Sequence, residues 1–516
     1  MKHFVCKPGV AEAQTTKGII RGYEFDGLTI FKGVPYAKAR RFHRPEPLEA
    51  WENVLECTSY GYTCPISVPK RPTGEISVPH RYWVENEDCL NLNLWTPALD
   101  GRKRPVLVWL HGGGFSDGSS IEQVAYDGAN LARRGDVVVI SINHRLNILG
   151  YFDLSDFGSE YENSGNAGTD DIIASLRWVH DNIEAFGGDP GNVTVFGQSG
   201  GGAKVTTLLQ TPEADGLFHR GINMSGVIGP ILGDAEGSGR ELAEAMMVEL
   251  GISTVSEMET VPYGQLRAAY DKVSPALRDQ GKYVGNAPYP NRFYAGDPLV
   301  NGFRTESASV PLMVGSVFGE FMGFFKLSGF TPNMSDEDAK AALIELAGGE
   351  IEELFPLFRK AYPDRPLQDL ARLDTFFRAP EIPYMKKRSA MNGCTYSYLF
   401  DMTFDVNERT VAWHCSDIPY VFANCDLVEY THQPGMEELE SQIADTVLAF
   451  ARTGNPNNPS IPKWSACTPD SENIMMFGGK THQAANYDHE LILKLAPIMA
   501  PVVRQIMSQS TEEVQH

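Results

Sequence analysis

The sequence predicts an α/β fold with a large, mostly parallel central sheet flanked by helices, and three observations point to it. Continuous apolar runs at 105–110 and 137–142 have the composition of strands that are buried on both faces, as in parallel sheets. Over 172–186, apolar residues recur at spacings of three and four, which is typical of an amphipathic helix. Strands and helices alternate through this part of the chain, and that rhythm predicts a parallel sheet covered on both faces.

The other elements follow from the same patterns. Strands are expected at 18–23, 28–31, 91–95, 221–224, 310–318 and 396–400, and helices at 124–134, 240–250, 437–452 and 491–507. Prolines at 65, 69, 72 and 79 indicate a surface loop over 57–86. No repeat or linker divides the chain, so residues 1–516 are interpreted as one domain. Within it, 230–310 and 321–395 are expected to be mainly helical insertions that form a cap and the walls of a pocket.

Composition narrows the classes of function. The formal net charge of −22 argues against a nucleic-acid partner or an anionic membrane surface. No run approaches the roughly 18 apolar residues of a membrane span. The first residues lack the apolar core of a signal peptide, so the chain as given is expected to be cytoplasmic, or secreted if such a signal was removed. A monomer is the working expectation for its oligomeric state.

The sequence gives no sign of a metal or a cofactor. Its eight cysteines are too sparse for a disulfide scaffold, and they form no C-x-x-C pair or Cys/His cluster with metal-ligand spacing. There is also no H-E-x-x-H motif and no P-loop. We therefore expect neither a bound metal nor a nucleotide cofactor.

One stretch carries a chemical signature. Residues 193–202 read Val-Thr-Val-Phe-Gly-Gln-Ser-Gly-Gly-Gly, a short strand that meets a G-x-S-x-G pattern before a helical pattern begins. A serine at so sharp a turn needs small neighbours, and Gly197 and Gly201 stand two positions away from Ser199 on either side. The five-residue pattern also occurs in flexible loops. The flanking strand and helix favour a nucleophile elbow.

Several motifs together resemble the type-B carboxylesterases, a family that includes cholinesterases and fungal lipases. They are the segments at 87–93, 111–115, 165–168 and 186–202, and the similarity extends from about residue 18 to about residue 464. The resemblance implies an α/β-hydrolase fold with helical cap insertions. It also implies a serine esterase that hydrolyses carboxylic esters through an acyl-enzyme.

The resemblance assigns a role to each residue that ester hydrolysis needs. The chemistry requires a nucleophile, a base, an acid that orients the base, and donors for the oxyanion. Ser199 matches the nucleophile, Glu320 matches the acid, and His414 matches the general base that follows the acid in this fold. The donors of the oxyanion hole are expected to be the amides of Gly113, Gly114 and Gly200.

Other matches are structural. Ser225 is expected to donate a hydrogen bond to Glu320. Cys64 and Cys89 occupy the positions of the family's first disulfide, whose formation would depend on the redox compartment. Two buried ion pairs are implied, Arg41 with Glu87 and Arg145 with Asp171.

The sequence departs from the cholinesterases at Gln198, where those enzymes carry a glutamate directly before the nucleophile. A neutral amide removes one attraction for a cationic alcohol group, and Trp83 is out of register with their choline-binding tryptophan. A choline ester is therefore not the expected substrate. Candidate pocket residues are Phe115, Gln198, Phe321, Phe324 and Trp413.

The leading interpretation is thus a serine carboxylic-ester hydrolase whose partner is a small-molecule ester. A lipase, or a carbamate or amide hydrolase of the same fold, is an alternative. A lipase would need an apolar lid, whereas residues 57–86 contain several charges and no long apolar face. The remaining alternative is a non-catalytic binding or adhesion relative, which would lack the serine or the histidine.

Overall fold

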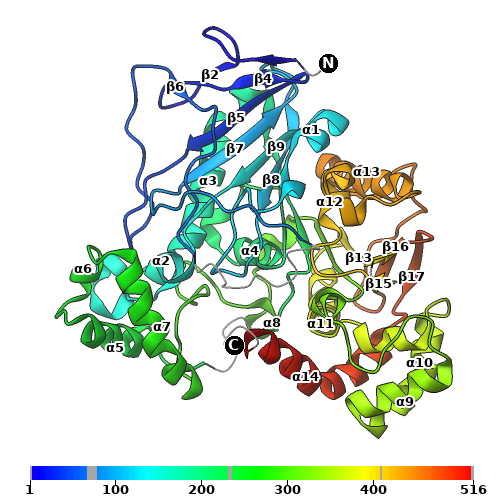
Figure 1. Ribbon diagram of the computed structural model, residues 1–516. Coiled ribbons are helices and arrows are strands. Elements are labelled where there is room, and N and C mark those ends of the chain that lie inside the picture. Colours follow the sequence, from blue (N-terminus) through cyan, green and yellow to red (C-terminus); the bar gives the residue numbers. More distant parts are fainter. Residues whose placement is uncertain (1–2, 67–77, 230–234, 407–408, 513–516) are drawn as a thin grey trace.

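The computed structural model describes residues 3–66, 78–229, 235–406 and 409–512, which form a twelve-stranded sheet with helices packed around it (Figure 1). Seven neighbouring strands run parallel, in the order β9, β8, β10, β11, β12, β13 and β16. Their bounds are Arg104–Leu110 (β8), Val138–Ile142 (β9), Gly188–Gln198 (β10), Arg220–Met224 (β11), Leu312–Val317 (β12), Thr395–Asp401 (β13) and Asn473–Gly478 (β16).

Antiparallel strands extend both edges of this block. One edge carries β7 (Asn91–Thr96), β5 (Leu28–Pro35), β4 (Tyr23–Phe25) and β1 (Phe4–Val5), and the other carries β17 (His482–Ala485). Two small sheets stand apart, formed by β2 (Glu12–Gln14), β3 (Ile19–Arg21) and β6 (Leu55–Glu56), and by β14 (Thr403–Phe404) and β15 (Thr410–Val411).

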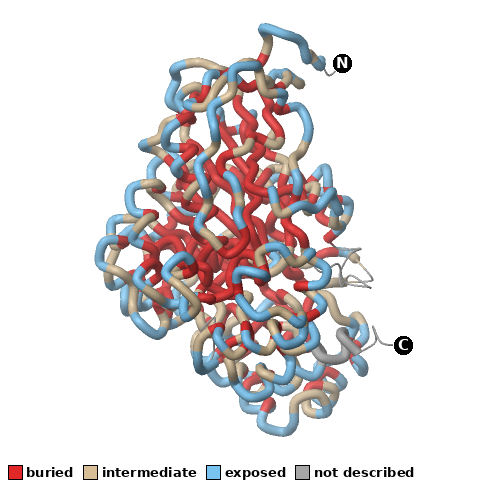
Figure 2. The backbone as a smooth tube through the Cα atoms, turned by 90° about the vertical axis from the view of Figure 1, so that its left-hand side faces the viewer, coloured by how far each residue is buried: buried red, intermediate tan, exposed pale blue. Residues whose placement is uncertain are grey.

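Both faces of the parallel strands are buried, as their apolar sequences predict. Along β8, Val106 and Val108 pack on the side of α3, whereas Leu107 and Trp109 pack on the side of α13. Successive side chains of a strand point to opposite faces, so a run of apolar residues supplies two cores at once. Figure 2 shows the result, with buried residues in the centre and exposed residues at the periphery.

The α-helices outside the two insertions are α1 (Ala129–Gly135), α2 (Asn147–Tyr151), α3 (Ala167–Asn182), α4 (Gly200–Leu209), α12 (Ile418–Phe422), α13 (Glu437–Thr453) and α14 (His489–Glu512).

Helices dominate the two stretches that the sequence marks as insertions. The first contains α5 (Arg240–Leu250), α6 (Val255–Met258), α7 (Tyr263–Asp279) and α8 (Pro298–Asn301), and the second contains α9 (Asp336–Ala347), α10 (Phe355–Ala361) and α11 (Arg378–Ser389). In Figure 1, α5–α7 gather at one lower corner, and α9 and α10 gather with α14 at the other.

Some details differ from the sequence-based expectation. The helix expected at 124–134 is a 3-10 turn, Val124–Tyr126, followed by α1, and Gly128 interrupts it where the backbone packs against Trp95. Strands β16 and β17 are not predicted, because β16 contains two methionines in place of the β-branched residues typical of strands. Residues 57–66 and 78–86 form no helix and no extended strand, as expected, while 67–77 lie outside the described residues.

Candidate active site

Ser199 lies at a strained turn between β10 and α4. Its φ of 58° and ψ of −125° are unusual for a residue with a side chain, and such a conformation costs on the order of 1–3 kcal/mol. A Cβ at Gly197 would lie 2.5 Å from the backbone of Gly201, and a Cβ at Gly201 would lie 1.9 Å from the Leu110 carbonyl oxygen. The Ser199 amide donates to the Met224 carbonyl at 2.8 Å. The turn therefore requires both glycines, and it is fastened to the neighbouring strand β11.

His414 and Glu320 are brought together by two loops at the ends of strands. One carboxylate oxygen of Glu320 hydrogen-bonds His414 Nδ1, and the His414 amide donates to the Glu320 carbonyl at 3.0 Å. The other carboxylate oxygen accepts from Ser225 Oγ at 2.6 Å and from the Val317 amide at 2.8 Å. Glu320 is fully buried. Because Nδ1 faces the carboxylate, Nε2 is the imidazole atom left for chemistry.

Gln198 links the elbow to this histidine. Its carboxamide nitrogen lies 3.3 Å from each imidazole nitrogen of His414, and its oxygen accepts a hydrogen bond from Cys415 Sγ at 3.2 Å. Within the described residues, the Ser199 hydroxyl itself makes no hydrogen bond to His414. Catalytic hydrogen bonds are often long without substrate and tighten when it binds. The imidazole therefore contacts the residue that directly precedes Ser199 in the chain.

Aromatic rings cover the imidazole. The Phe321 ring centroid lies 4.4 Å from that of His414, and the Phe377 ring stacks on it at 5.2 Å with an interplanar angle of 7°. Phe321 is a candidate pocket residue in the sequence, but Phe377 is not. Phe377 directly precedes α11, and no local motif marks it, because its contact with His414 depends on how the second insertion folds back.

The other candidate pocket residues lie in different surroundings. Phe115 is buried and packs edge-on against Tyr151, with ring centroids 5.1 Å apart. Trp413 is buried against Phe404, with centroids 4.6 Å apart, and Phe324 is half-buried on the wall of a cavity that Trp413 also lines. Gln198 is fully buried under the base.

The three glycines expected to form an oxyanion hole lie close together. Gly113 and Gly114 have φ values of 82° and 61°, in the left-handed region that glycine adopts most readily. A Cβ on Gly200 would come within 2.1 Å of the Gly114 carbonyl oxygen, so the loop and the start of α4 are in contact. No hydrogen bond within the described part of the chain uses the amides of these glycines. These three amides therefore have no acceptor among the described residues.

A buried lysine stands behind this loop. Lys204, on α4, is 1% exposed, and its ammonium donates to the His111 carbonyl at 3.0 Å. Burial lowers the Lys204 pKa to about 7, although the negative charges of Glu122 and Asp117 act in the opposite direction. The His111 ring stacks on that of His144 with centroids 5.0 Å apart, and burial holds the pKa of both imidazoles well below the ordinary value. No sequence motif points to Lys204.

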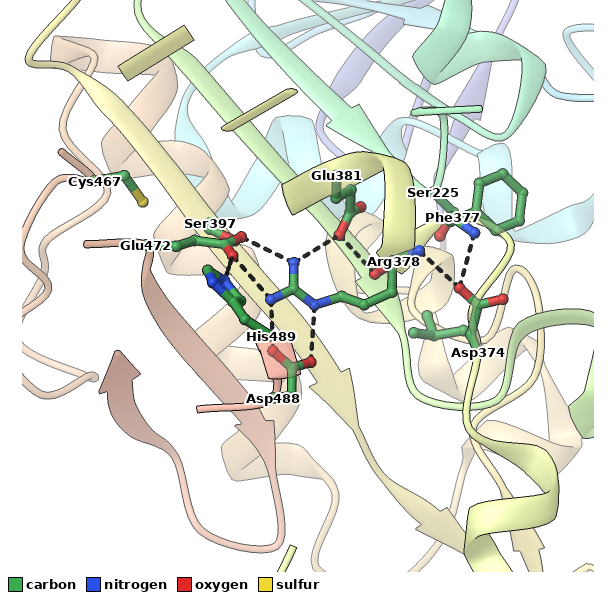
Figure 3. A network of polar contacts seen from close by, with 12 residues as sticks. Ser225, Asp374, Phe377, Arg378, Glu381, Ser397, Cys467, Glu472, Asp488 and His489 are labelled. Atoms are coloured by element: carbon green, nitrogen blue, oxygen red, sulfur yellow. Dashed lines mark hydrogen bonds and ion pairs between the residues drawn. The ribbon is translucent and has the colours of Figure 1, made fainter. Parts of the chain in front are cut away.

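Two further buried carboxyl groups lie near the acid. Burial, reinforced by the negative charge of Glu320, raises the pKa of Asp374 and of Asp417 to about 7. Asp417 accepts a hydrogen bond from the Tyr398 hydroxyl at 3.0 Å. Asp374 accepts hydrogen bonds from the three amides at 376–378, at 2.9 to 3.0 Å, and Figure 3 shows those from Phe377 and Arg378. It thereby fixes the start of α11 and the phenylalanine that covers the base.

The two ion pairs implied by the resemblance are present. Arg41 Nε lies 2.8 Å from a Glu87 carboxylate oxygen, and Arg145 makes two hydrogen bonds to Asp171 at 2.6 and 2.8 Å. The second pair is fully buried. Arg145 also donates to the carbonyls of residues 40 and 43, so it fastens the N-terminal segment to the sheet.

Cys64 and Cys89 are adjacent buried thiols rather than a disulfide. A hydrogen bond with Cys64, together with burial, raises the pKa of the Cys89 thiol well above its ordinary value. The pairing implied by the resemblance therefore has the right partners, in the reduced form.

A serine on a strained strand–helix turn of a mostly parallel sheet, next in the chain to a residue that contacts a histidine held by a buried carboxylate, defines an α/β-hydrolase. The chain belongs to the Carboxylesterase family, whose profile its residues 10–492 match. It is 32% identical to the para-nitrobenzyl esterase of Bacillus subtilis (strain 168) over 506 residues, covering 94% of this chain and 98% of that protein. It is 31% identical to the phenmedipham hydrolase of Pseudarthrobacter oxydans over 497 residues, covering 92% and 96%.

A solved structure also supports the assignment to this family. An esterase from anaerobic Clostridium hathewayi, described as able to hydrolyse aliphatic aromatic polyesters, superimposes with a TM-score of 0.93 at 47% identity and covers 96% of this chain and 99% of its own. The fold class and the enzyme class predicted from the sequence are confirmed: the enzyme is a type-B carboxylesterase that hydrolyses small-molecule carboxylic esters. None of the helices in the described ranges is both long and apolar enough to cross a membrane.

Proposed function

We propose that Ser199, His414 and Glu320 are the catalytic triad of this esterase. One observation carries the assignment: the buried Glu320 carboxylate hydrogen-bonds His414 Nδ1 while the imidazole lies against the residue that precedes Ser199. Ser225 and Val317 hold the carboxylate from its other side. The histidine is thus fixed in one tautomer and one orientation, as a general base requires.

The mechanism follows from this arrangement. Ser199 Oγ attacks the ester carbonyl while His414 Nε2 takes its proton, and Glu320 stabilises the imidazolium that forms. The amides of Gly113, Gly114 and Gly200 bind the oxyanion of the tetrahedral intermediate; losing one such donor typically costs about 2.7–4 kcal/mol. His414 then protonates the departing alkoxide. Water hydrolyses the acyl-enzyme by the same steps, with His414 as the base.

Replacement of the nucleophile tests the assignment. Ser199→Ala should lower kcat on p-nitrophenyl acetate by roughly a million-fold and abolish labelling by a fluorophosphonate probe. Ser256→Ala, on the exposed surface of α6, is the control and should leave both unchanged. Hydrolysis or labelling that survives in Ser199→Ala would show that another residue is the nucleophile.

We further propose that the substrates are neutral esters of aromatic or aliphatic acids. The Clostridium hathewayi esterase, to which this chain is 47% identical, supports this class, and Gln198 supplies no negative charge for a cationic alcohol. A lipase activity, or a carbamate or amide hydrolase activity, is tested by the same panel. Steady-state kinetics on esters that vary acyl and alcohol size separately, with a matched choline ester, carbamate, amide and emulsified triglyceride, should show the highest kcat/KM on soluble neutral esters.

We propose a reducing, cytoplasmic location, because all eight cysteines are free thiols and two of them lie in contact. Titration of the denatured protein, purified anaerobically from its native cell, should count eight thiols. A count of six that rises to eight with reductant would reveal one disulfide. If the Cys64→Ser variant lacks that disulfide, the bond involves Cys64, and the enzyme comes from an oxidising compartment.

A further inference from the structure

A cavity of about 650 Å³ lies beside the loops that carry the acid and the base. Its described walls come from residues 323–326 and 330–332 after β12, from the 3-10 helix Leu367–Arg372, and from Val406 and residues 409–411. Trp413, next to His414, and Gly323, on the same 3-10 helix as Glu320, form the wall nearest the catalytic residues. The volume is within the usual range of small-molecule sites, about 300–1,000 Å³.

Among the described residues that line the cavity, positive charges outnumber negative ones, although the chain as a whole carries a net charge of −22. Lys326, Arg372 and Arg409 supply the positive charges, and Asp369 supplies a carboxylate. That carboxylate is already engaged by Arg365 at 2.9 Å, and Arg409 lies 3.5 Å from it.

Two of these cations lack partners within the described ranges. Arg372, which is half-buried, makes no hydrogen bond and no ion pair there, and neither does the exposed Lys326. Burial lowers the pKa of the Arg372 guanidinium, and Asp369 offsets this effect only in part. A half-buried charge without a partner is costly, and an anion that enters the cavity would relieve that cost.

Other groups on the wall also lack partners. Gln368 is 6% exposed and its carboxamide oxygen has no hydrogen-bond partner, and the indole N–H of the buried Trp413 has none either, within the described residues. Phe324, Phe325 and Phe330 add aromatic rings to the wall, beside smaller apolar and hydroxyl side chains. The cavity therefore combines polar groups without hydrogen-bond partners and flat apolar surface.

We propose that this cavity is a second binding site, which takes a small carboxylic acid. The carboxylate pairs with Arg372, assisted by Lys326, and an aromatic or aliphatic body packs on the phenylalanines. Arginine binds carboxylates through a planar fork of donors, which a lysine alone does not supply. Carboxylic acids are the products of ester hydrolysis, so the ligand belongs to the class that this enzyme releases. Because the site shares its wall with the loops of Glu320 and His414, an occupied site is expected to slow catalysis without excluding substrate.

Binding of benzoate to the full-length Ser199→Ala variant, measured by titration calorimetry, tests the site independently of the proposed nucleophile. One saturable site is expected, with at least a tenfold loss of affinity when Arg372→Gln or Lys326→Gln is added. Benzamide, which has the same shape without the charge, should not bind. Arg240→Gln, an exposed arginine on α5, is the control and should leave benzoate affinity unchanged.

Kinetics on the otherwise wild-type enzyme separate this site from the catalytic pocket. Benzoate should inhibit hydrolysis of a neutral ester by lowering kcat with little effect on KM, and Arg372→Gln should remove that inhibition. Equal affinity in Arg372→Gln, equal binding of benzamide, or purely competitive inhibition would overturn the proposal. If Ser199 were not the nucleophile, Ser199→Ala would still hydrolyse esters, and the binding result would stand.

Discussion

Lys204 places an amine in the buried region behind Gly113 and Gly114, two of the proposed oxyanion donors. It lies on the helix that begins with Gly200, and it holds the carbonyl of His111, which leads into the loop of Gly113 and Gly114. The side chain therefore connects the two segments that supply the oxyanion donors. The charged form of so buried a lysine is unfavourable. We propose that the lysine is nevertheless kept at this position because its hydrogen bond to the His111 carbonyl holds the loop in place.

Lys204→Met should lower kcat at least tenfold with a smaller change in KM, because removing an oxyanion donor outright costs about 10²–10³ in kcat and misplacing the donors costs less. Lys32→Met is the matched control. Lys32, on β5, is also buried, and burial lowers its pKa to about 7. Its ammonium lies 3.6 Å from the centre of the Trp95 ring. Its replacement should leave kcat unchanged. An equal loss of kcat in both variants would show that Lys204 has only a general structural role.

The two lysines also predict a pH dependence of stability. Between pH 7 and the ordinary lysine pKa of about 10.4, the folded protein holds these amines neutral while the unfolded chain binds a proton. The free energy of unfolding of the wild type should therefore rise with pH across this window, by up to about 1.4 kcal/mol per pH unit for each lysine. In each methionine variant the free energy of unfolding should rise less steeply with pH, because one of the two lysines is missing. Urea unfolding at pH 7, 8 and 9 measures these free energies. The same pH dependence in the wild type and the variants would contradict the prediction.

Gln198 offers a test of the electrostatics at the base. Gln198→Glu would place a carboxylate about where the amide now lies, 3.3 Å from the imidazole nitrogens. A negative charge there stabilises the protonated histidine, so the acid limb of kcat/KM should move to higher pH by about one unit or more. Gln198→Met, which adds no charge, should leave the limb in place. Identical limbs in the two variants would contradict the contact between position 198 and His414.

At the scale of elements, an arginine joins three segments that are distant in the sequence. Arg378, in the first turn of α11, donates to Glu472 on the loop before β16 and to Asp488 at the start of α14, at 2.8 to 3.0 Å (Figure 3). Glu472 also accepts from Ser397 at 2.7 Å and contacts His489 Nε2 at 2.5 Å. The network fixes the end of α11 from which Phe377 reaches His414, the proposed catalytic base.

Removal of this arginine should destabilise the protein strongly. Arg378→Met leaves buried carboxylates without their cation, which costs about 3–5 kcal/mol. Arg240→Met, which breaks an exposed pair with Asp156, should cost less than about 1 kcal/mol. Burial alone would raise the Glu472 pKa, but Arg378 and the hydrogen bonds hold it at about 2. The stabilisation is therefore present above the ordinary glutamate pKa of about 4.3 and is lost as pH falls toward 2. Urea unfolding at pH 7, 4 and 3 should show the two arginine variants converging.

The elements that the sequence predicts well are those with a local cause. The strand at 105–110 and the helix after Ser199 are recognisable because buried runs and glycine spacing are local features, and both are present as β8 and α4. The strand at 473–478 is missed because its methionines carry no strand signal, and the hairpin β14–β15 is missed because each of its strands has two residues. Their places are set by pairing with β13 and with each other, which is tertiary information.

The same distinction holds for the site as a whole. Motifs locate the serine, the glutamate and the histidine, because a strained turn and a loop after a strand leave a mark in the sequence. Phe377, Asp374 and Lys204 leave none. Phe377 reaches His414 across 37 positions of the chain, a contact that depends on how an insertion packs. Motifs thus predict the reacting groups, whereas the groups that surround them are known only from the folded chain.

At the scale of the whole molecule, we propose that the sheet and both insertions are one domain. Leu242, Met246 and Leu266 of the first insertion belong to the apolar cluster that covers the α3 face of the sheet. Leu343 and Phe358 of the second belong to the cluster on the opposite face. Among the described residues, neither insertion forms an apolar cluster of its own, so each is expected to lose its structure together with the sheet.

This proposal predicts a single unfolding transition for regions that different probes report. All seven tryptophans lie outside 230–310 and 321–395, so intrinsic fluorescence follows the body of the molecule and not the insertions. Pulsed hydrogen exchange with mass spectrometry, in a urea series, reports α5, α7 and α9 from their own peptides. Their protection should disappear at the same urea concentration as that of β8 and β10, and at the midpoint of the fluorescence change. Loss of protection in α5 and α7 at a lower urea concentration, with β8 still protected, would instead make the first insertion a separate folding unit.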